Sequence, residues 1–305
     1  MKLKFDITGK TQPDPFIFKD DDGKLYIYST GVDGIHAYCA NAIEDEWKYM
    51  GVILSVPRGD EYWAPSMIKL DGKYYLYFSY QIPGMFEHMH VAVSDNPIGP
   101  FEKPVRLYKR FTIDSHVVKT DAGLFLWYAE DNENCERIGT RVFVDKLLDP
   151  FTPANICKEV IIPTCDEEIT GQRPNGPWHT VEGPFWFREG EWQYVMYSAG
   201  AFTDDTYHIG YACAKSDEED LMKVDFIKQT DNGKFKPVMF KTDFEEGVGH
   251  HSVIKIDNEY YAIYHARDIN SQNSKSEKYI EERTARFCKL KVKDGIITAD
   301  QKENI

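Results

Sequence analysis

The sequence predicts an all-β protein, a five-bladed β-propeller, from three observations. Five segments share one pattern, in which an apolar triplet ends in Lys or Arg and an acidic or Gly turn leads into a Tyr-rich run. This pattern is typical of a strand, a tight turn and a second strand. A further strand-like segment follows each of these hairpins. The repeats begin 50 or 68 residues apart, and periods near 50 are typical of propeller blades.

The repeats account for nearly the whole chain. They are DPFIFKDDDGKLYIYS from Asp14, APSMIKLDGKYYLYFS from Ala64, DSHVVKTDAGLFLWYA from Asp114, EGPFWFREGEWQYVMYS from Glu182 and HHSVIKIDNEYYAIYH from His250. The third strands are expected at 34–40, 88–94, 137–144, 207–214 and 283–292. The wider spacing of the last repeats predicts loops at 163–180 and 215–247. An open sandwich of hairpins is the alternative. No linker is visible, so residues 1–305 are expected to form a single catalytic domain.

Composition excludes some partners. The chain of 305 residues has 36 Lys and Arg against 50 Asp and Glu, a net charge of −14. Nucleic acid and anionic membranes attract a positive field, so neither is expected as a partner. The start, MKLKFDITGK, lacks the apolar core of a secretory signal, and the six cysteines form no CxxC pair. These features predict a cytoplasmic protein with reduced thiols, and they leave the oligomeric state open.

The heads of the repeats carry the residues that suggest chemistry. Alignment on the closing Lys or Arg places Asp14, Ala64, Asp114 and His250 at one position, with Glu182 one residue earlier. Because the innermost strands of a propeller surround one axis, three carboxylates and a histidine are expected to converge there. Hydrolysis of a glycosidic bond needs such a set, one acid to protonate the leaving oxygen and one base to activate water.

Glu182 is the candidate acid, because it heads the aromatic run of VEGPFWF and burial there would raise its pKa. A second carboxylate nearby, Asp114, would add like-charge repulsion. Trp63 offers a flat face for a sugar ring or, equally, packs in a blade core, and Tyr62 is expected to line the same pocket. Asp14 precedes a proline, so a plain turn residue is its alternative.

Six motifs in order resemble glycoside hydrolase family 43. They are DPFIF (14–18), YWAPS (62–66), SDNPIGPF (94–101), IDSHVV (113–118), VEGPFWF (181–187) and GHHSVIK (249–255). The resemblance implies a five-bladed propeller that hydrolyses arabinose- or xylose-containing glycans with inversion at the anomeric carbon. It also implies Asp14 as general base, Glu182 as general acid and Asp114 as the carboxylate that orients and tunes the acid. His250 and Arg283 are implied as substrate-binding residues, with no required cofactor and with His250 as a ligand of a structural calcium ion in the central channel.

The expected function is the removal of terminal α-L-arabinofuranosyl or β-D-xylosyl units from short oligosaccharides, and the choice between the two sugars stays open. Within the family, an endo-arabinanase is the alternative. Outside that chemistry, a carbohydrate-binding propeller without catalysis, a fructoside-acting propeller and a glycoside phosphorylase remain. Phosphorolysis needs cations at the site, for which Arg283 and Arg267 are the candidates.

Overall fold

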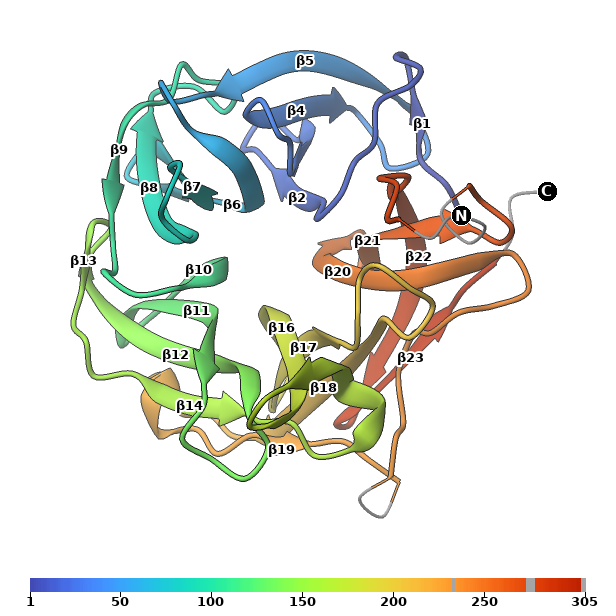
Figure 1. Cartoon of the computed structure of the whole chain (residues 1–305). Helices are drawn as coiled ribbons and strands as arrows, with labels where there is room; N and C mark the ends of the chain where they lie inside the picture. The colour runs from blue at the N-terminus through green and yellow to red at the C-terminus, as the bar shows by residue number, and fades with distance from the viewer. Residues whose placement is uncertain (232–233, 273–277, 303–305) are drawn as a thin grey trace.

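The computed structural model of the chain describes residues 1–231, 234–272 and 278–302. Its regular secondary structure is almost wholly β-strand, and the strands form mainly antiparallel units around a central axis in the order of the chain (Figure 1). The innermost strand of each unit lies nearest that axis. The all-β class is confirmed.

The strand bounds follow the repeats. The first sheet, ordered β1-β5-β4-β3-β2, comprises β1 (Lys4–Phe5), β2 (Phe16–Lys19), β3 (Leu25–Ser29), β4 (Ile35–Ala40) and β5 (Glu46–Leu54). The second comprises β6 (Asp60–Leu70), β7 (Lys73–Gln81), β8 (His88–Ser94) and β9 (Glu102–Arg106). The last comprises β20 (Glu245–Ile256), β21 (Glu259–Asp268), β22 (Thr284–Lys293) and β23 (Ile296–Asp300).

Between these lies a ten-stranded sheet made of two antiparallel units. One contains β10 (Ile113–Thr120), β11 (Gly123–Asn132), β12 (Gly139–Asp149), β13 (Thr152–Pro153) and β14 (Lys158–Ile161). The other contains β15 (Ile169–Arg173), β16 (Gly176–Glu189), β17 (Trp192–Ala199), β18 (His208–Lys215) and β19 (Ile227–Lys228). Two parallel pairs join them, Gly139 with His179 and Thr140 with Thr180. Strand pairing thus forms five units in four sheets, antiparallel except for the pair of β1 with β5 in the first, and five separate blades remain a prediction.

The predicted loop at 163–180 is partly wrong. It contains a short 3-10 helix, Asp166–Glu168, and β15, which forms a hairpin with the start of β16. These strands are rich in Gly and polar residues, so they lack the apolar alternation by which a half-buried strand is recognised. The segment 215–247 holds a 3-10 helix at Leu221–Lys223 and only the two-residue strand β19 before β20 begins.

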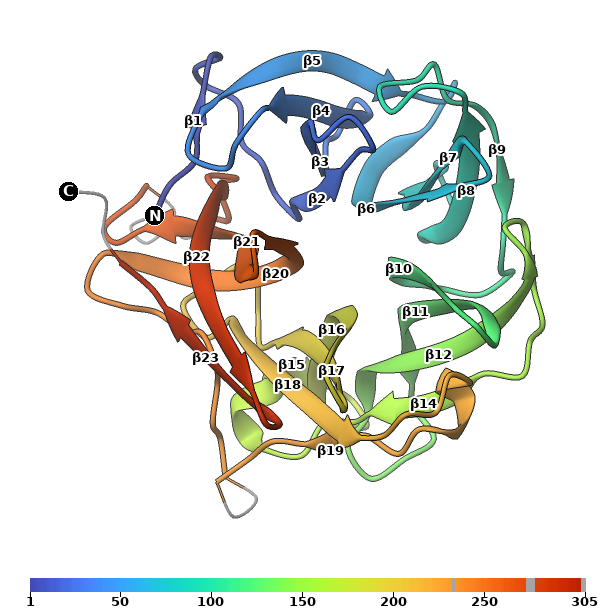
Figure 2. The same ribbon diagram turned by 180° about the vertical axis from the view of Figure 1, so that it is seen from behind.

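The hydrophobic core lies between neighbouring units. One cluster packs Ile17 and Trp47 of the first unit against Ile263 and Phe287 of the last. The N-terminal segment continues this contact, since the Leu3 N–H donates to the carbonyl oxygen of Ala285 over 3.1 Å. Figure 2 shows this segment beside β22. The first and last parts of the chain therefore close the ring.

The five repeat heads share one unusual backbone conformation. Their φ angles are positive, and they belong to Asp14 (51°), Ala64 (47°), Asp114 (62°), Gly183 (57°) and His250 (44°). In the last four units the regular strand register is interrupted at the same place. Such a bulge re-aims a side chain, and left-handed non-glycine residues are uncommon and strained. Glycine fills this position in the fourth unit, which agrees with the predicted offset of Glu182 by one residue.

The bulges also link adjacent units. A backbone N–H that leaves the strand ladder needs another partner when it is buried. In four cases a side chain of the preceding unit accepts it, with the last unit preceding the first. The pairs are Asp14 N–H to His265 Nδ1 (3.1 Å), Ala64 N–H to Thr30 Oγ1 (2.8 Å), Gly183 N–H to Asp114 Oδ2 (2.9 Å) and His250 N–H to Ser198 Oγ (2.8 Å).

Ala64 is the repeat head that has a strained positive φ but carries no polar side chain. Replacing it by glycine should raise the free energy of unfolding by about 0.5 kcal/mol, because glycine adopts a positive φ without a Cβ clash and this gain exceeds its larger unfolded-state entropy. Denaturant titration measures the effect. The control Ala212→Gly, within the regular strand β18, should lower the free energy by about 1 kcal/mol. A loss of stability in Ala64→Gly as large as in the control would contradict a strained bulge.

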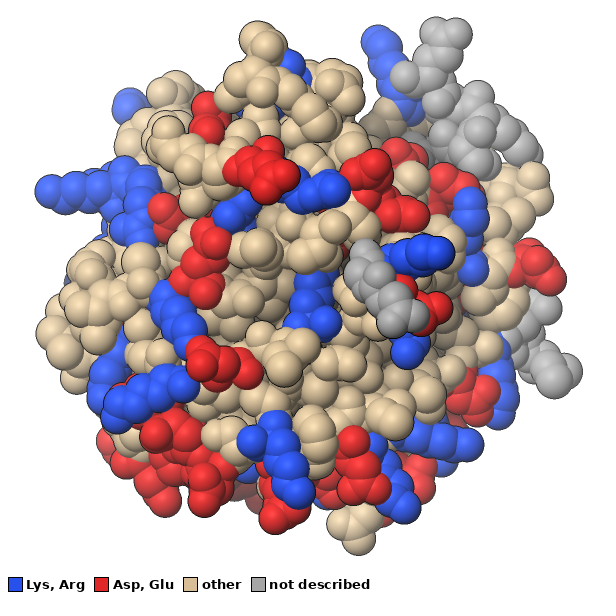
Figure 3. All heavy atoms as spheres, turned by 90° about the horizontal axis from the view of Figure 1, so that it is seen from below, with Lys and Arg blue, Asp and Glu red and all other residues tan. Residues whose placement is uncertain are grey.

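On the face shown in Figure 3, acidic and basic side chains are intermixed. This face therefore shows no continuous basic surface, and the expectation that nucleic acid is not a partner stays a prediction. Within the described ranges, the chain has no helix with the length and apolar character needed to cross a bilayer.

Candidate active site

A pocket of about 680 Å³ opens at the centre of the ring, at the level of the repeat heads. Its walls include most of the predicted site residues, namely Asp14, Trp63, Asp114, Glu182, His250 and Arg283. They come from all five units, so distant parts of the chain do converge as the repeat alignment predicted. The volume lies within the range of about 300–1,000 Å³ that is typical of small-molecule sites.

Asp14 is held as a carboxylate. Its Oδ1 accepts a hydrogen bond from Arg283 Nη1 at 3.1 Å and lies 3.5 Å from His250 Nδ1, and its Oδ2 accepts from the Thr30 hydroxyl at 2.5 Å. Burial alone would raise the pKa of Asp14, but the positive charge of Arg283, followed by His250, holds that pKa well below its usual value. Asp14 is therefore ionised at neutral pH.

The pKa of Glu182 is shifted in the opposite direction. Burial raises the pKa of Glu182 to about 7, against the lowering effect of the hydrogen bond that Tyr207 donates to Oε1 at 2.7 Å. The negative charge of Asp14 raises that pKa further. Two carboxyl groups in one pocket thus have pKa values that their environments push apart, which is the arrangement that acid–base catalysis requires.

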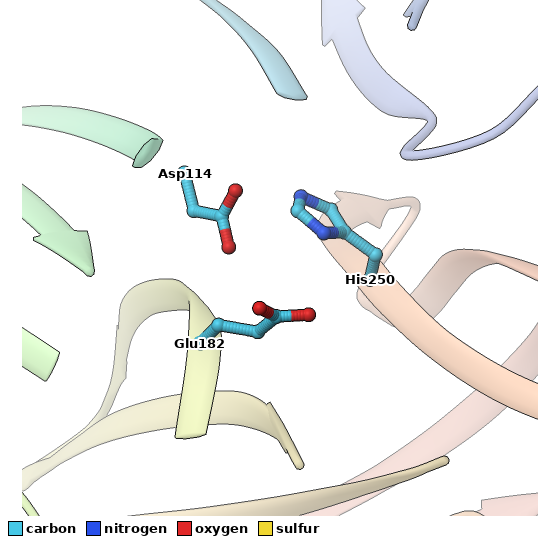
Figure 4. A group of neighbouring side chains, drawn as sticks. All are labelled: Asp114, Glu182 and His250. Atoms are coloured by element: carbon cyan, nitrogen blue, oxygen red, sulfur yellow. The ribbon is translucent and has the colours of Figure 1, made fainter. Parts of the chain in front are cut away.

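Asp114 and His250 complete the centre with Glu182. Their side chains, from β10, β16 and β20, point toward one another (Figure 4). One ligand atom of each lies within 4.8 Å of the others. Burial, and next the charge of Glu182, raise the pKa of Asp114 well above its usual value. The two neighbouring carboxyls therefore resist joint ionisation, as the sequence suggested for a second carboxylate beside the acid.

Of the two predicted aromatic residues, Trp63 lies in the pocket and Tyr62 does not. Trp63 lines the pocket, with its indole N–H donated to Glu61 Oε2 at 2.9 Å. Tyr62 does not: its ring is fully buried against Tyr80, and its hydroxyl bonds both the N–H and the carbonyl oxygen of Val56. Prediction of Tyr62 as a substrate-binding residue is wrong, because neighbouring residues of a strand point to opposite faces.

The two arginines considered as phosphate-binding candidates lie in different places. Arg283 lies in the pocket, where it binds Asp14 and, through Nη2, Glu281 Oε2 at 2.6 Å. Arg267 is fully buried and donates to the carbonyl oxygens of Phe202 (2.6 Å) and Asp204 (2.8 Å). Its guanidinium thus holds a loop in place and does not face the pocket where a phosphate would bind.

Sequence reasoning missed several residues of the pocket. Tyr207 contacts the candidate acid, Glu281 pairs with Arg283, and Phe202 lies under the Arg283 guanidinium, 4.7 Å from Cζ to the ring centroid. Tyr207 heads the predicted strand 207–214, and that position was its signal in the sequence. Gly249 was another sign, because a Cβ there would lie 1.9 Å from the Tyr207 ring.

A calcium ion at this site would need water molecules for most of its ligands. Calcium prefers six to eight oxygen ligands, whereas Asp14 is engaged with Arg283 and Asp114 with the Gly183 N–H. The small cavity beneath the pocket is lined by His250 and by His251, whose ring nitrogens have no partner within the described residues. These residues fit a hydrated ion held by one imidazole, and the calcium ion stays a prediction.

Comparison with known proteins identifies the family. Residues 7–297 match the model of the family described as Glycosyl hydrolases family 43, and the chain belongs to that family. This confirms the resemblance carried by the six motifs and with it the enzyme class, glycosyl hydrolase.

Individual relatives are distant. An extracellular exo-alpha-(1->5)-L-arabinofuranosidase from Streptomyces avermitilis is 27% identical over 278 residues, which cover 84% of this chain and 54% of that protein. This chain thus spans about half the length of that relative. Arabinan endo-1,5-alpha-L-arabinosidase A of Aspergillus niger is 24% identical over 240 residues, covering 73% of this chain and 72% of that enzyme. The crystal structure of a thermostable family-43 glycoside hydrolase has a TM-score of 0.81 at 24% identity, covering 99% and 96% of the two chains, and it supports the fold.

The prediction of a cytoplasmic location is wrong. It depended on the missing signal and the unpaired cysteines, whereas a relative matching most of this chain is named an extracellular enzyme. The first residues of the printed sequence are no evidence against export. The expectation that substrates are short oligosaccharides depended on a cytoplasmic location, so it no longer has a basis.

Proposed function

We propose that the protein is an inverting glycoside hydrolase that removes terminal α-L-arabinofuranosyl or β-D-xylosyl units from plant-type glycans. One observation carries the proposal: a single pocket holds a carboxylate kept ionised, Asp14, together with Glu182, a carboxyl whose pKa is raised to about 7. Family membership and the named activities of the relatives support the substrate class.

In the proposed reaction, Glu182 gives its proton to the glycosidic oxygen as the bond to the anomeric carbon breaks. Asp14 takes a proton from a water molecule, whose oxygen attacks that carbon from the opposite face. Inversion needs room for this water, so the two carboxyls of inverting enzymes stand roughly 6.5–9.5 Å apart. Their origin in the first and fourth units, across the central pocket, suits that separation.

Other residues support the two carboxyls. Asp114 is proposed to orient Glu182, since it accepts the N–H of the adjacent Gly183. Arg283 and His250 are proposed to fix Asp14 and to bind sugar hydroxyls, while Trp63 offers an apolar face to the ring. A calcium ion held by His250 would supply positive charge to this centre.

Endo-acting arabinanase is the second candidate. The pocket is larger than a single pentose needs, and the Aspergillus niger relative is named an endo-arabinosidase. A phosphorylase is disfavoured because both terminal nitrogens of Arg267 donate to loop carbonyls and Arg283 is already paired with two carboxylates. A purely binding propeller would have no use for carboxyls with opposed pKa values.

The test is hydrolysis of 4-nitrophenyl α-L-arabinofuranoside, 4-nitrophenyl β-D-xyloside and linear 1,5-arabinan. We expect turnover of an aryl glycoside, with the first-formed anomer inverted when its proton NMR spectrum is followed in time. A rate independent of phosphate separates hydrolysis from phosphorolysis. Release of arabinose alone from arabinan indicates exo action, whereas a ladder of oligomers indicates endo action. A retained anomer, or no turnover of any substrate, would overturn the proposal.

A further inference from the structure

We propose that Tyr207 and His265 form a bracket that fixes the candidate acid Glu182 relative to the candidate base Asp14, with the Tyr207 hydroxyl selecting which oxygen of Glu182 carries the proton. The inference rests on the proposed function and assigns positioning roles to two residues of the same site.

Tyr207 is built into the structure on three sides. Its hydroxyl donates to Glu182 Oε1 at 2.7 Å, and its side chain is almost wholly buried. Its ring stacks on the imidazole of His265, with centroids 5.6 Å apart and planes 11° from parallel. Gly249 lies against the ring edge and leaves no room for a Cβ. The phenol therefore has one position, and that position faces the acid.

His265 connects the same stack to the base. The ring belongs to β21 and is fully buried. Its Nδ1 accepts the backbone N–H of Asp14 at 3.1 Å and lies 3.3 Å from Asp14 Oδ1. The left-handed backbone of Asp14, with φ of 51°, is thus held by the residue that also supports Tyr207.

The contacts form a continuous path from Glu182 through Tyr207 and His265 to Asp14. Inverting hydrolysis depends on a fixed gap between acid and base, and an error near 1 Å in a reacting group costs about 10²-fold in rate. The path also has a chemical effect. Since Glu182 Oε1 accepts from the phenol, the proton of the neutral acid lies on Oε2, the oxygen left for the leaving group.

Other charged groups also act on Glu182, so the effect of Tyr207 must be separated from theirs. The groups that influence its carboxyl are Asp114 of β10, Asp131 of β11, His250 of β20, and Asp14 and Arg283 from the segments before β2 and β22. A change at Tyr207 leaves all of these in place. A change at Tyr207 should therefore shift the pKa of Glu182 without removing any charged group from the pocket.

The test is Tyr207→Phe, which removes one oxygen atom. A phenol donor favours the ionised form of Glu182, so its removal raises the pKa of the acid. We expect the alkaline limb of the kcat/KM profile on an aryl glycoside to move up by roughly 0.5 to 1 pH unit. We also expect kcat to fall at least about tenfold with KM little changed, because the acid is no longer aligned.

The matched control is Tyr211→Phe, on β18, whose buried hydroxyl donates to the Gly295 carbonyl oxygen outside the pocket. It should leave both the limb and kcat unchanged. His265→Ala should lower kcat with KM little changed, and His265→Asn should recover part of the loss, because an amide oxygen can accept the Asp14 N–H. If His265→Ala does not fold, Tyr207→Phe alone decides.

The outcomes separate the bracket from the proposed function. If Glu182→Gln abolishes the alkaline limb while Tyr207→Phe leaves the limb and kcat as in the wild type, the bracket is wrong and the acid assignment stands. If Glu182→Gln keeps normal activity and the same limb, the proposed function itself fails.

Discussion

Glu182→Gln should lower turnover of an unactivated glycoside by at least about 10²-fold, the scale of lost general acid assistance. The amide has no proton to give to the leaving oxygen. Wild-type activity should fall as pH rises through about 7, because the acid loses its proton there, and this limb should be absent in the variant. Stopped assays of kcat/KM across pH measure both effects.

The leaving group supplies the control for this variant. A 2,4-dinitrophenyl glycoside departs with little need of protonation, so Glu182→Gln should lose much less activity on it than on an alkyl glycoside. An equal loss on both substrates would contradict the acid role and indicate damage to binding or folding.

Asp14→Asn should also lower turnover by at least about 10²-fold, and here the loss should be similar for good and poor leaving groups. The substitution removes the group that accepts the proton of the attacking water, a step that every substrate shares. Arg283 keeps its contacts with Glu281, so the pocket is expected to retain its shape. Steady-state kinetics with the same pair of glycosides measure the pattern.

Asp20→Asn is the matched control. Asp20 also has a lowered pKa, which results from hydrogen bonds of Lys69 and Tyr74 acting against burial, but it lies outside the pocket. It should leave turnover near the wild-type value. Loss of activity in Asp14→Asn only on poor leaving groups would reassign Asp14 from base to acid.

Repetition made the fold predictable. Each unit repeats the strand–turn–strand signal, and alignment on its closing basic residue brought Asp14, Ala64, Asp114 and His250 to one position, where the structure has a positive φ. Segments without repetition were less clear. The hairpin of β15 and β16 was taken for a loop because Gly and polar residues hide its strands.

The site was predictable where side chains leave the innermost strands. The bulge that re-aims these residues also decides which neighbour enters the pocket, so Trp63 and Tyr62 could not be told apart by pattern alone. Tyr207 and His265 reach the centre from strands farther out. Their contacts depend on how units pack against one another, which the periodicity of one chain does not encode.

The closure of the ring has a consequence during synthesis. Asp14 is translated 251 residues before His265 and 269 residues before Arg283, which hold its backbone and its charge. Under the proposed mechanism a nascent chain has no working base until Arg283 has left the ribosome. A prematurely terminated product is therefore an inactive fragment and not a weaker enzyme.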